Sequence, residues 1–94
     1  MMVVRNVFIA KPGKASQLAK QMKEVMSSRP GPKVRVLTDY IGTFNTVIME
    51  FDVNNLAEFE KQYAEYLSNP EIREKMKGYA DMYQEGYREV LQVI

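Results

Sequence analysis

The 94-residue sequence contains no histidine, no cysteine and no tryptophan. Without these side chains the protein has no thiolate nucleophile, no disulfide, no imidazole base and no imidazole ligand for zinc or haem iron. We therefore expect no cofactor and no metal site. Charge of one sign is also not in excess, because 13 Lys and Arg stand against 12 Asp and Glu, and the net charge is +1. This is far below the basic excess that binds nucleic-acid phosphates, so we expect no nucleic-acid partner.

Long apolar runs are missing as well. Arg5 and Asn6 interrupt the first apolar stretch, and no run of the ~7 to 15 apolar residues typical of a secretory signal follows a basic start. Nothing approaches the ~20 apolar residues that a membrane span needs. We expect a cytoplasmic protein with no membrane partner. With 46% hydrophobic and 27% charged residues, the composition is that of a globular chain, and residues 1–94 are enough for one domain.

Four segments rich in β-branched and aromatic residues are predicted to be strands. They are Met2 to Ala10, Lys33 to Tyr40, Thr46 to Val53 and Tyr87 to Ile94. Gly42 and Asn45 supply the conformational freedom of a hairpin loop between the second and third segments. These two strands should therefore pair antiparallel.

Helical periodicity appears after the turn formed by Lys11, Pro12 and Gly13. From Lys14 to Met26 the apolar residues recur at the i, i+3, i+4, i+7 spacing of one helical face, which predicts an amphipathic helix. The segment from Ser27 to Pro32 should end it, because proline cannot continue the hydrogen-bond ladder.

Two further helices are predicted in the second half of the chain. Asn55 and Glu58 have the spacing of a capping box and open the first of them at Leu56. Asn69 and Pro70 interrupt this helix and start the next one at once, since proline is tolerated at the first helical position. The last helix carries Ile72, Met76, Tyr79 and Tyr83 on one side, and it should end at Gly86.

The order strand, helix, strand, strand, two helices, strand predicts an α+β, ferredoxin-like fold. In this fold two right-handed crossovers place the first and third strands at the centre of a four-stranded antiparallel sheet. The connection between the second and third helices is too short to pass around a sheet edge. All helices should therefore cover the same face of the sheet.

The strands are apolar on both faces. The first strand has Val3, Val7 and Ile9 on one parity and Val4 and Phe8 on the other. Helices of ~10 Å diameter cover only one face of a sheet whose area is on the order of 500 Å². A second copy packed on the open face would bury the other side, so we predict a homodimer with a two-fold axis. The alternative is a monomer whose sheet is merely apolar.

Several short motifs, spread over nearly the whole chain, resemble those of NIPSNAP-like members of the dimeric α/β-barrel superfamily. They are the start from Val3 to Lys14 ending in Lys-Pro-Gly-Lys, the hairpin GTFNT at 42–46 followed by VIMEFDV, the helix start LAEFE at 56–60, and EGYREV at 85–90. The resemblance implies a ferredoxin-like subunit and a dimer whose two sheets form a barrel. The chain also resembles the antibiotic-monooxygenase-like members of the same superfamily.

The activities that the resemblance implies are diverse. The superfamily includes cofactor-independent monooxygenases of aromatic polyketides, haem-degrading enzymes, isomerases and many proteins without a known activity, so the fold alone does not set the function. The haem-using branches usually depend on a histidine or a tryptophan, and neither is present in this sequence.

Aromatic residues are concentrated in the predicted helix layer. We predict that Tyr63, Tyr66, Tyr79 and Tyr83, together with Phe8, line a cleft between the helices and the sheet. Aromatic faces there would bind a flat apolar ligand while the hydroxyls fix its orientation. The alternative is that this stripe is ordinary core with its hydroxyls at the rim.

Two polar residues within strands are candidate catalytic groups. Asn6 shares the parity of Phe8, and an amide under the sheet can orient a substrate oxygen or stabilise an oxyanion. Glu50 and Asp52 share a parity on a predicted central strand, and two desolvated carboxylates raise one another's pKa toward that of a general base. A buried, satisfied amide is the alternative for Asn6.

Ion pairing is the alternative for the carboxylate. Glu50 can pair across strands with Arg5, Arg35 or Arg88. We expect Arg88 and Glu89 to belong to such an ion-pair network rather than to clamp a substrate.

Three functions remain open. The first is a homodimeric barrel that binds a small apolar or aromatic molecule. The second is a cofactor-independent monooxygenase or isomerase in which the protein mainly positions a reactive substrate. The third is a structural dimerisation module whose cavity is filled by side chains.

Overall fold

The computed structural model describes residues 1–27 and 33–94. Along the chain the elements are β1 (Met2–Ala10), α1 (Ala15–Ser27), β2 (Arg35–Thr38), β3 (Thr46–Val53), α2 (Leu56–Ser68), α3 (Pro70–Lys75), the 3-10 helix η1 (Tyr79–Asp81) and β4 (Tyr83–Gln92). The helix-breaking segment predicted before the second strand lies, from residue 28 to residue 32, outside the described residues. Among the described residues, no helix is both long enough and apolar enough to cross a membrane.

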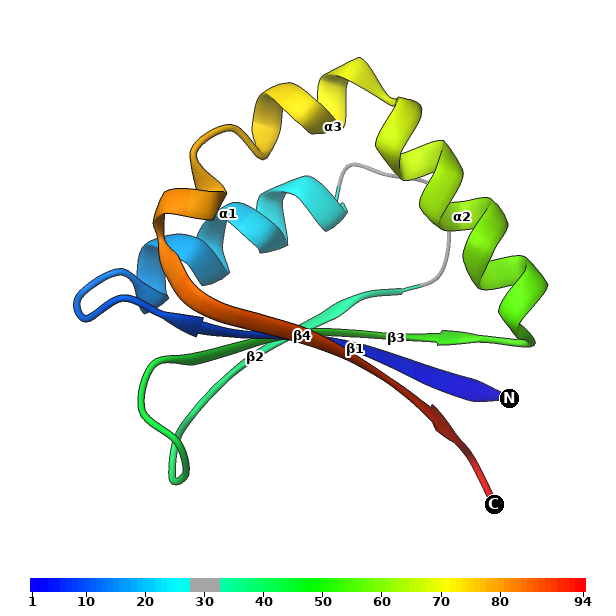
Figure 1. Cartoon of the computed structure of the whole chain (residues 1–94), viewed down its shortest axis with the longest axis horizontal. Coiled ribbons are helices and arrows are strands. Elements are labelled where there is room, and N and C mark those ends of the chain that lie inside the picture. The colour runs from blue at the N-terminus through cyan, green and yellow to red at the C-terminus, as the bar shows by residue number, and fades with distance from the viewer. Residues whose placement is uncertain (28–32) are drawn as a thin grey trace.

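The strands form one antiparallel sheet in the order β2-β3-β1-β4. The two central strands are therefore β3 and β1, as the ferredoxin-like prediction requires. Figure 1 shows α1, α2 and α3 on one side of the sheet and no helix of the described residues on the other side. The predicted α+β, ferredoxin-like architecture with helices on one face is confirmed.

Helix α1 packs on the sheet through the apolar stripe that its sequence pattern predicts. Leu18, Met22, Val25 and Met26 are buried, and they meet Val47 in the main core. A smaller core cluster lies at the other end of the sheet. Both clusters are on the helix-covered side, so this side holds the apolar core of the isolated chain.

The two predicted N-caps are formed as expected. The side-chain oxygen of Asn55 accepts a hydrogen bond from the backbone N–H of Glu58 at 2.9 Å, and the Glu58 carboxylate returns to the N–H of Asn54. The side-chain oxygen of Asn69 accepts from the backbone N–H groups of Glu71 and Ile72. The Asn69 cap lies at the sharp corner between α2 and α3 that Figure 1 shows, and the Asn55 cap begins α2 at its other end.

The end of the third helix differs from the sequence prediction. Helix α3 ends at Lys75 rather than near Gly86, and Gly78 then has a positive φ of 85°, a conformation that favours glycine. Tyr83 is the first residue of β4, so Gly86 lies inside a strand. Pairing of β4 with β1, which begins at Ala10 opposite Tyr83, outweighs the local helical periodicity.

The second strand also differs in length, since it covers Arg35–Thr38 rather than Lys33 to Tyr40. The following loop reaches β3 through Asn45, which has a positive φ of 67°. This agrees with the loop role predicted for Asn45.

Residues in register form rows across the sheet, and successive rows point to opposite faces. One row runs through Val36, Met49, Asn6 and Arg88 and belongs to the helix-covered face. The next rows run through Arg35, Glu50, Arg5 and Glu89 and through Leu37, Ile48, Val7 and Tyr87, and these belong to the uncovered face. We call this uncovered side the open face.

Candidate ligand cavity

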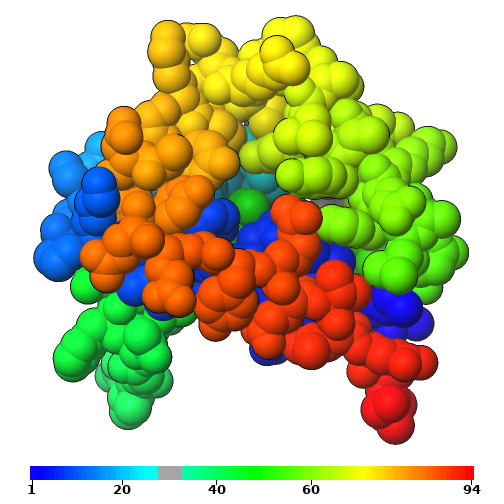
Figure 2. All heavy atoms as spheres, viewed as in Figure 1, coloured from blue at the N-terminus to red at the C-terminus, as the bar shows by residue number. Residues whose placement is uncertain are grey.

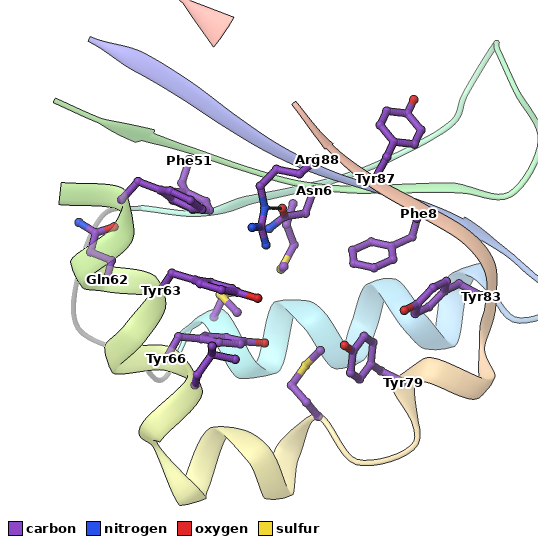
Figure 3. Close-up of a pocket in the computed structure, with 16 residues that line it drawn as sticks. Asn6, Phe8, Phe51, Gln62, Tyr63, Tyr66, Tyr79, Tyr83, Tyr87 and Arg88 are labelled. Carbon is purple, nitrogen blue, oxygen red and sulfur yellow. Dashed lines mark hydrogen bonds between the residues drawn. The ribbon is translucent and has the colours of Figure 1, made fainter. Parts of the chain in front are cut away.

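A cavity of about 290 Å³ lies between the sheet and the arch formed by α2, α3 and η1. Figure 2 shows its opening, a hollow bordered by α2, α3 and β4 with atoms of β1 and β3 at its base. It is lined by Asn6, Phe8, Met26, Met49, Phe51, Phe59, Gln62, Tyr63, Tyr66, Leu67, Met76, Tyr79, Tyr83, Gly86, Tyr87 and Arg88. The lining is thus mainly aromatic and thioether side chains. Tyr87 borders the cavity, although its side chain points away from it, to the open face (Figure 3).

One wall of the cavity is a stack of aromatic rings on α2. Phe59, Tyr63 and Tyr66 follow one another at helical spacings of four and three residues, which places them on one side of the helix. The Phe59 and Tyr63 ring centroids are 5.8 Å apart, and those of Tyr63 and Tyr66 are 6.4 Å apart, with nearly parallel planes. Phe51 from β3 extends the stack at 6.4 Å from Phe59.

The opposite wall is a second aromatic cluster. Phe8 from β1 contacts Tyr83 edge-on at 4.9 Å and Tyr79 at 6.4 Å, and the two tyrosine rings are 5.7 Å apart. The absence of a side chain at Gly86 leaves space for the Phe8 ring, because a Cβ at Gly86 would lie 3.2 Å from Phe8 Cδ1. The glycine that was expected to end a helix instead accommodates this ring.

The four tyrosine hydroxyls of these walls point toward the space between them. In Figure 3 the hydroxyls of Tyr63 and Tyr66 are directed toward the opposite wall, and those of Tyr79 and Tyr83 are directed back toward α2. Burial raises the pKa of Tyr79 above its ordinary value, and the neighbouring Tyr83 adds to this effect. The raised pKa keeps the Tyr79 hydroxyl protonated further into alkaline pH, and a protonated hydroxyl can donate a hydrogen bond to a ligand.

Arg88 projects from β4 into the cavity beside Asn6 (Figure 3). Its Nε donates a hydrogen bond to the side-chain oxygen of Asn6 at 2.6 Å. Its guanidinium carbon lies 4.7 Å from the centroid of the Tyr63 ring and 5.2 Å from that of Phe59. Such contacts with aromatic faces favour a cation, so the α2 stack and Asn6 together position the guanidinium.

Gln62 adds a polar group at the edge of the same cavity. Its amide nitrogen donates to the Glu58 carboxylate at 3.2 Å. Its amide oxygen is buried and has no hydrogen-bond partner among the described residues. Figure 3 shows this amide beside α2, directed away from the space between the two aromatic walls.

Glu50 lies on the open face, on the other side of the sheet from Asn6. Its carboxylate accepts hydrogen bonds from Arg5 Nε at 2.7 Å and from the Arg35 guanidinium. The hydrogen bond from Arg5 is the main cause that holds the pKa of Glu50 below its usual range, and Arg35 adds to it against the opposing effect of burial. The expectation of a raised pKa is therefore wrong, and the ion-pair alternative is confirmed.

The fold brings together Asn6 and all five residues that the sequence proposed for ligand binding. Phe8, Tyr63, Tyr66, Tyr79 and Tyr83 line the cavity with Asn6, whereas Glu50 does not. Sequence reasoning missed the remaining lining residues, of which Phe51, Phe59, Gln62 and Arg88 are the most prominent. Phe59 had a signal, because it shares the helical face of Tyr63 and Tyr66.

Arg88 had no such signal. Its expected role in an ion-pair network with Glu89 is wrong, because the two side chains alternate across β4 and Arg88 forms no ion pair with any described residue. Only the register of β4 against β1, which pairs Arg88 with Asn6, places the guanidinium on the cavity side.

Neither a family model nor a curated protein sequence matches the chain. Solved structures do. An uncharacterised NIPSNAP domain protein from Burkholderia xenovorans has a TM-score of 0.85 and 14% identity, covering 100% of this chain and 95% of its own. A NIPSNAP family protein from Agrobacterium tumefaciens has a TM-score of 0.84 and 13% identity, with coverages of 97% and 90%.

A structure described as a putative antibiotic biosynthesis monooxygenase from Chloroflexus aurantiacus is also similar. Its TM-score is 0.69 with 17% identity, over 98% of this chain and 92% of that chain. At these identities the similarity establishes the fold. The chain therefore has the ferredoxin-like fold of NIPSNAP-domain and antibiotic-monooxygenase proteins, which confirms the resemblance found in the sequence motifs.

Proposed function

We propose that residues 1–94 form a single domain that acts as a cytoplasmic homodimer and binds a small, flat aromatic molecule in the cavity between helices and sheet. The observation that carries the proposal is the pair of facing aromatic walls, each built from side chains of more than one element. Within each wall the rings pack on one another, with centroids 5.8 Å apart for Phe59 and Tyr63 and 4.9 Å apart for Phe8 and Tyr83, so each wall offers a preformed aromatic surface to a planar ligand. An open cavity of about 290 Å³ supports this function over a module filled by its own side chains.

The open face supports the homodimer. The row of Leu37, Ile48, Val7 and Tyr87 crosses all four strands as a continuous apolar band. Leu37 is 37% and Tyr87 52% exposed in the isolated chain. A second copy packed face to face would remove this band from water without any change in the helix layer.

The charged row beside this band is suited to burial between two copies. Arg35 and Arg5 both bind Glu50, and Glu89 stands opposite Arg5 in register. Two cations and two carboxylates make the row neutral as a whole. Burial of this row would thus leave no excess charge within the interface.

Two arms beside the open face extend the same surface. The loop between β2 and β3 and the C-terminal end both project from the sheet on the side away from the helices (Figure 1). The loop exposes Tyr40 by 97%, Ile41 by 91% and Phe44 by 82%. The sheet face alone is on the order of 500 Å², and these arms bring the area toward the ~800 Å² per partner of a stable interface.

Sedimentation tests the dimer directly. At micromolar concentration we expect a mass twice the 10.9 kDa of the chain. Leu37→Lys should shift the protein to monomer, because it places a charge in the apolar band of both copies. Leu56→Lys, at an exposed leucine on α2, is the matched control and should remain dimeric. A wild-type mass near that of one chain would refute the dimer.

Calorimetric titration with a two-ring aromatic compound tests ligand binding. Wild-type protein should bind one molecule per chain, and Tyr63→Ala should weaken binding several-fold by removing a ring from the centre of the α2 stack. Leu56→Ala, at an exposed leucine on α2 outside the cavity and outside the proposed dimer interface, is the control and should bind as wild type does. Native mass spectrometry of the purified protein would identify a retained ligand, and failure of every aromatic probe to bind would contradict the proposal.

A cofactor-independent monooxygenase or isomerase is the second candidate. It is favoured by the position of Asn6 in the cavity and by the similarity to the Chloroflexus aurantiacus structure, which is described as a putative antibiotic biosynthesis monooxygenase. In this candidate Asn6 either binds a substrate oxygen itself or positions the Arg88 guanidinium, which donates a hydrogen bond to the Asn6 side chain. Glu50, with its lowered pKa and its place on the open face, does not suit a general base for this site.

Asn6→Leu separates the two candidates once a turned-over substrate is found. Retained folding and retained ligand binding with lost turnover would support catalysis through the amide. Unchanged turnover would remove the proposed role of Asn6.

A further inference from the structure

We propose that the ligand of this cavity is an aromatic acid whose anionic oxygens bind the Arg88 guanidinium. The inference rests on the proposed ligand-binding function and specifies the chemical class of the ligand. The cavity is bordered by a cation, Arg88, that has no carboxylate partner among the described residues.

Arg88 is the only charged side chain among the described residues that line the cavity. No described carboxylate lies within ion-pair distance of it. Glu85 and Glu89, the acidic residues of β4, alternate with Arg88 and so belong to the open face. The arginines of the open face are different, since Arg5 and Arg35 are both paired with Glu50.

The guanidinium is held in one orientation by its other contacts. Its Nε is occupied by the Asn6 oxygen at 2.6 Å, and aromatic rings of α2 lie against it. The two terminal Nη groups have no hydrogen-bond partner among the described residues. Figure 3 shows the guanidinium directed into the space between the aromatic walls. Two parallel N–H donors are the arrangement that matches the two oxygens of a carboxylate.

The energetics favour an acid over a neutral ring. A neutral aromatic ring that filled the cavity would displace water from the guanidinium and offer it only contact with a ring face, so the terminal N–H donors would lose hydrogen bonds, which is unfavourable. A carboxylate on the same ring system replaces that water with a charge-assisted hydrogen bond. The tyrosine hydroxyls directed into the cavity add further donors for anionic oxygens.

A matched pair of probes tests the inference at pH 8, where carboxylic acids are fully ionised. 2-Naphthoate and 2-naphthamide share their ring system and shape but differ in charge. We expect the wild-type protein to bind 2-naphthoate at least about tenfold more tightly than 2-naphthamide. Arg88→Gln should abolish this preference by weakening naphthoate binding alone, whereas Arg88→Lys, which keeps the charge but not the fork, should retain part of it.

Arg73→Gln is the control, because it removes one positive charge from α3 outside the cavity. The preference for 2-naphthoate should survive in this variant. Equal loss in Arg73→Gln and Arg88→Gln would indicate attraction by net charge and would overturn the inference. A preference that survives in a folded Arg88→Gln protein would overturn it too. If Arg88→Gln does not fold, an undiminished preference in Arg88→Lys overturns the bidentate contact and a reduced one supports it.

The probes also separate the inference from the function on which it rests. Equal binding of the two compounds to the wild-type protein, or tighter binding of 2-naphthamide, would overturn the acid while leaving an aromatic-binding cavity. Saturable binding of neither compound would overturn both.

Discussion

The two faces of the sheet place arginine in opposite electrostatic situations. On the open face, Arg5 Nε lies 2.7 Å from a Glu50 oxygen, and the same carboxylate binds Arg35. On the helix-covered face, Arg88 Nε lies 2.6 Å from a neutral Asn6 oxygen, and its charge has no carboxylate partner among the described residues. The two arrangements are one row apart in the same sheet.

This difference shows how a strand separates two kinds of chemistry. Successive side chains point to opposite faces, so Arg5 and Asn6 are neighbours in sequence but belong to different environments. The open face carries a neutralised charge row next to an apolar band, which suits contact with another protein surface. The covered face carries a buried apolar core beside a cavity whose described lining has one cation, Arg88, without a described carboxylate partner, the arrangement from which we infer an anionic ligand.

The largest expected effect tests which face holds the core. Leu18 on α1 is completely buried under the sheet, so Leu18→Ala should lower the free energy of unfolding by about 3 kcal/mol. Leu37→Ala on the open face should lower it by less than about 1 kcal/mol, because that side chain is already partly exposed in the isolated chain. Urea unfolding measures both. If the two variants lost the same free energy of unfolding, and if both losses stayed the same at lower protein concentration, the difference between the faces would be contradicted.

The next effect concerns the charge row of the open face. Glu50 is 5% exposed and binds two arginines, so Glu50→Gln should lower the free energy of unfolding by about 1 to 2 kcal/mol. The loss stays at this level because both arginine side chains keep contact with water, which screens the pair. Asp52→Asn is the control on the same strand and face, where the carboxylate is exposed. Comparable losses in the two variants would contradict the role of the pair.

Acid provides an independent test of the same row. Because the pKa of Glu50 is lowered in the folded state, its carboxylate stabilises the fold fully above the ordinary value of 4.5. This contribution is lost as the pH falls below 4.5 and through the lowered pKa of the folded protein. The free energy of unfolding of Glu50→Gln should therefore fall less steeply with acid than that of wild type. Urea unfolding at several pH values measures this. If the free energy of unfolding of the two proteins fell in parallel from neutral to acidic pH, the role of Glu50 would be contradicted.

The smallest expected effect on stability is at the cavity itself. A Cβ at Gly86 lies 3.2 Å from Phe8 Cδ1, so Gly86→Ala should push the Phe8 ring toward the cavity. The free energy of unfolding should change by less than about 1 kcal/mol, because alanine also removes the entropic disadvantage of glycine in a strand. We expect the loss in binding free energy for the two-ring aromatic probe to be larger than this change in the free energy of unfolding. Unchanged affinity in calorimetric titration would show that the Phe8 ring does not border the ligand.

Local sequence patterns predicted the elements where local forces decide them. The stripe of Leu18, Met22 and Val25 predicted α1, and Asn55 and Asn69 predicted two helix starts, because caps and amphipathic spacing act within a few residues. The end of α3 was predicted wrongly. Tyr83 continues the helical period in sequence, but its backbone pairs with Ala10, more than 70 residues away.

The candidate site was predictable in part for the same reason. Tyr63 and Tyr66 share a helical face, and Phe8 and Asn6 share a strand parity, so short-range periodicity was enough to group them. Arg88 was not predictable, because its position depends on the register between the two ends of the chain. A shift of one residue would have placed it on the open face.

The amino-acid sequence by itself determined the order of helices and strands, the excess of apolar sheet surface and the absence of imidazole and thiol chemistry, since these follow from composition and short-range periodicity. The tertiary structure decided which charges meet. Pairing of β1 with both β3 and β4 places Arg5 beside Glu50 and Arg88 beside Asn6. The first arginine is therefore neutralised, and the second has no carboxylate partner among the described residues. Long-range register sets these contacts, and no local pattern in the chain encodes it.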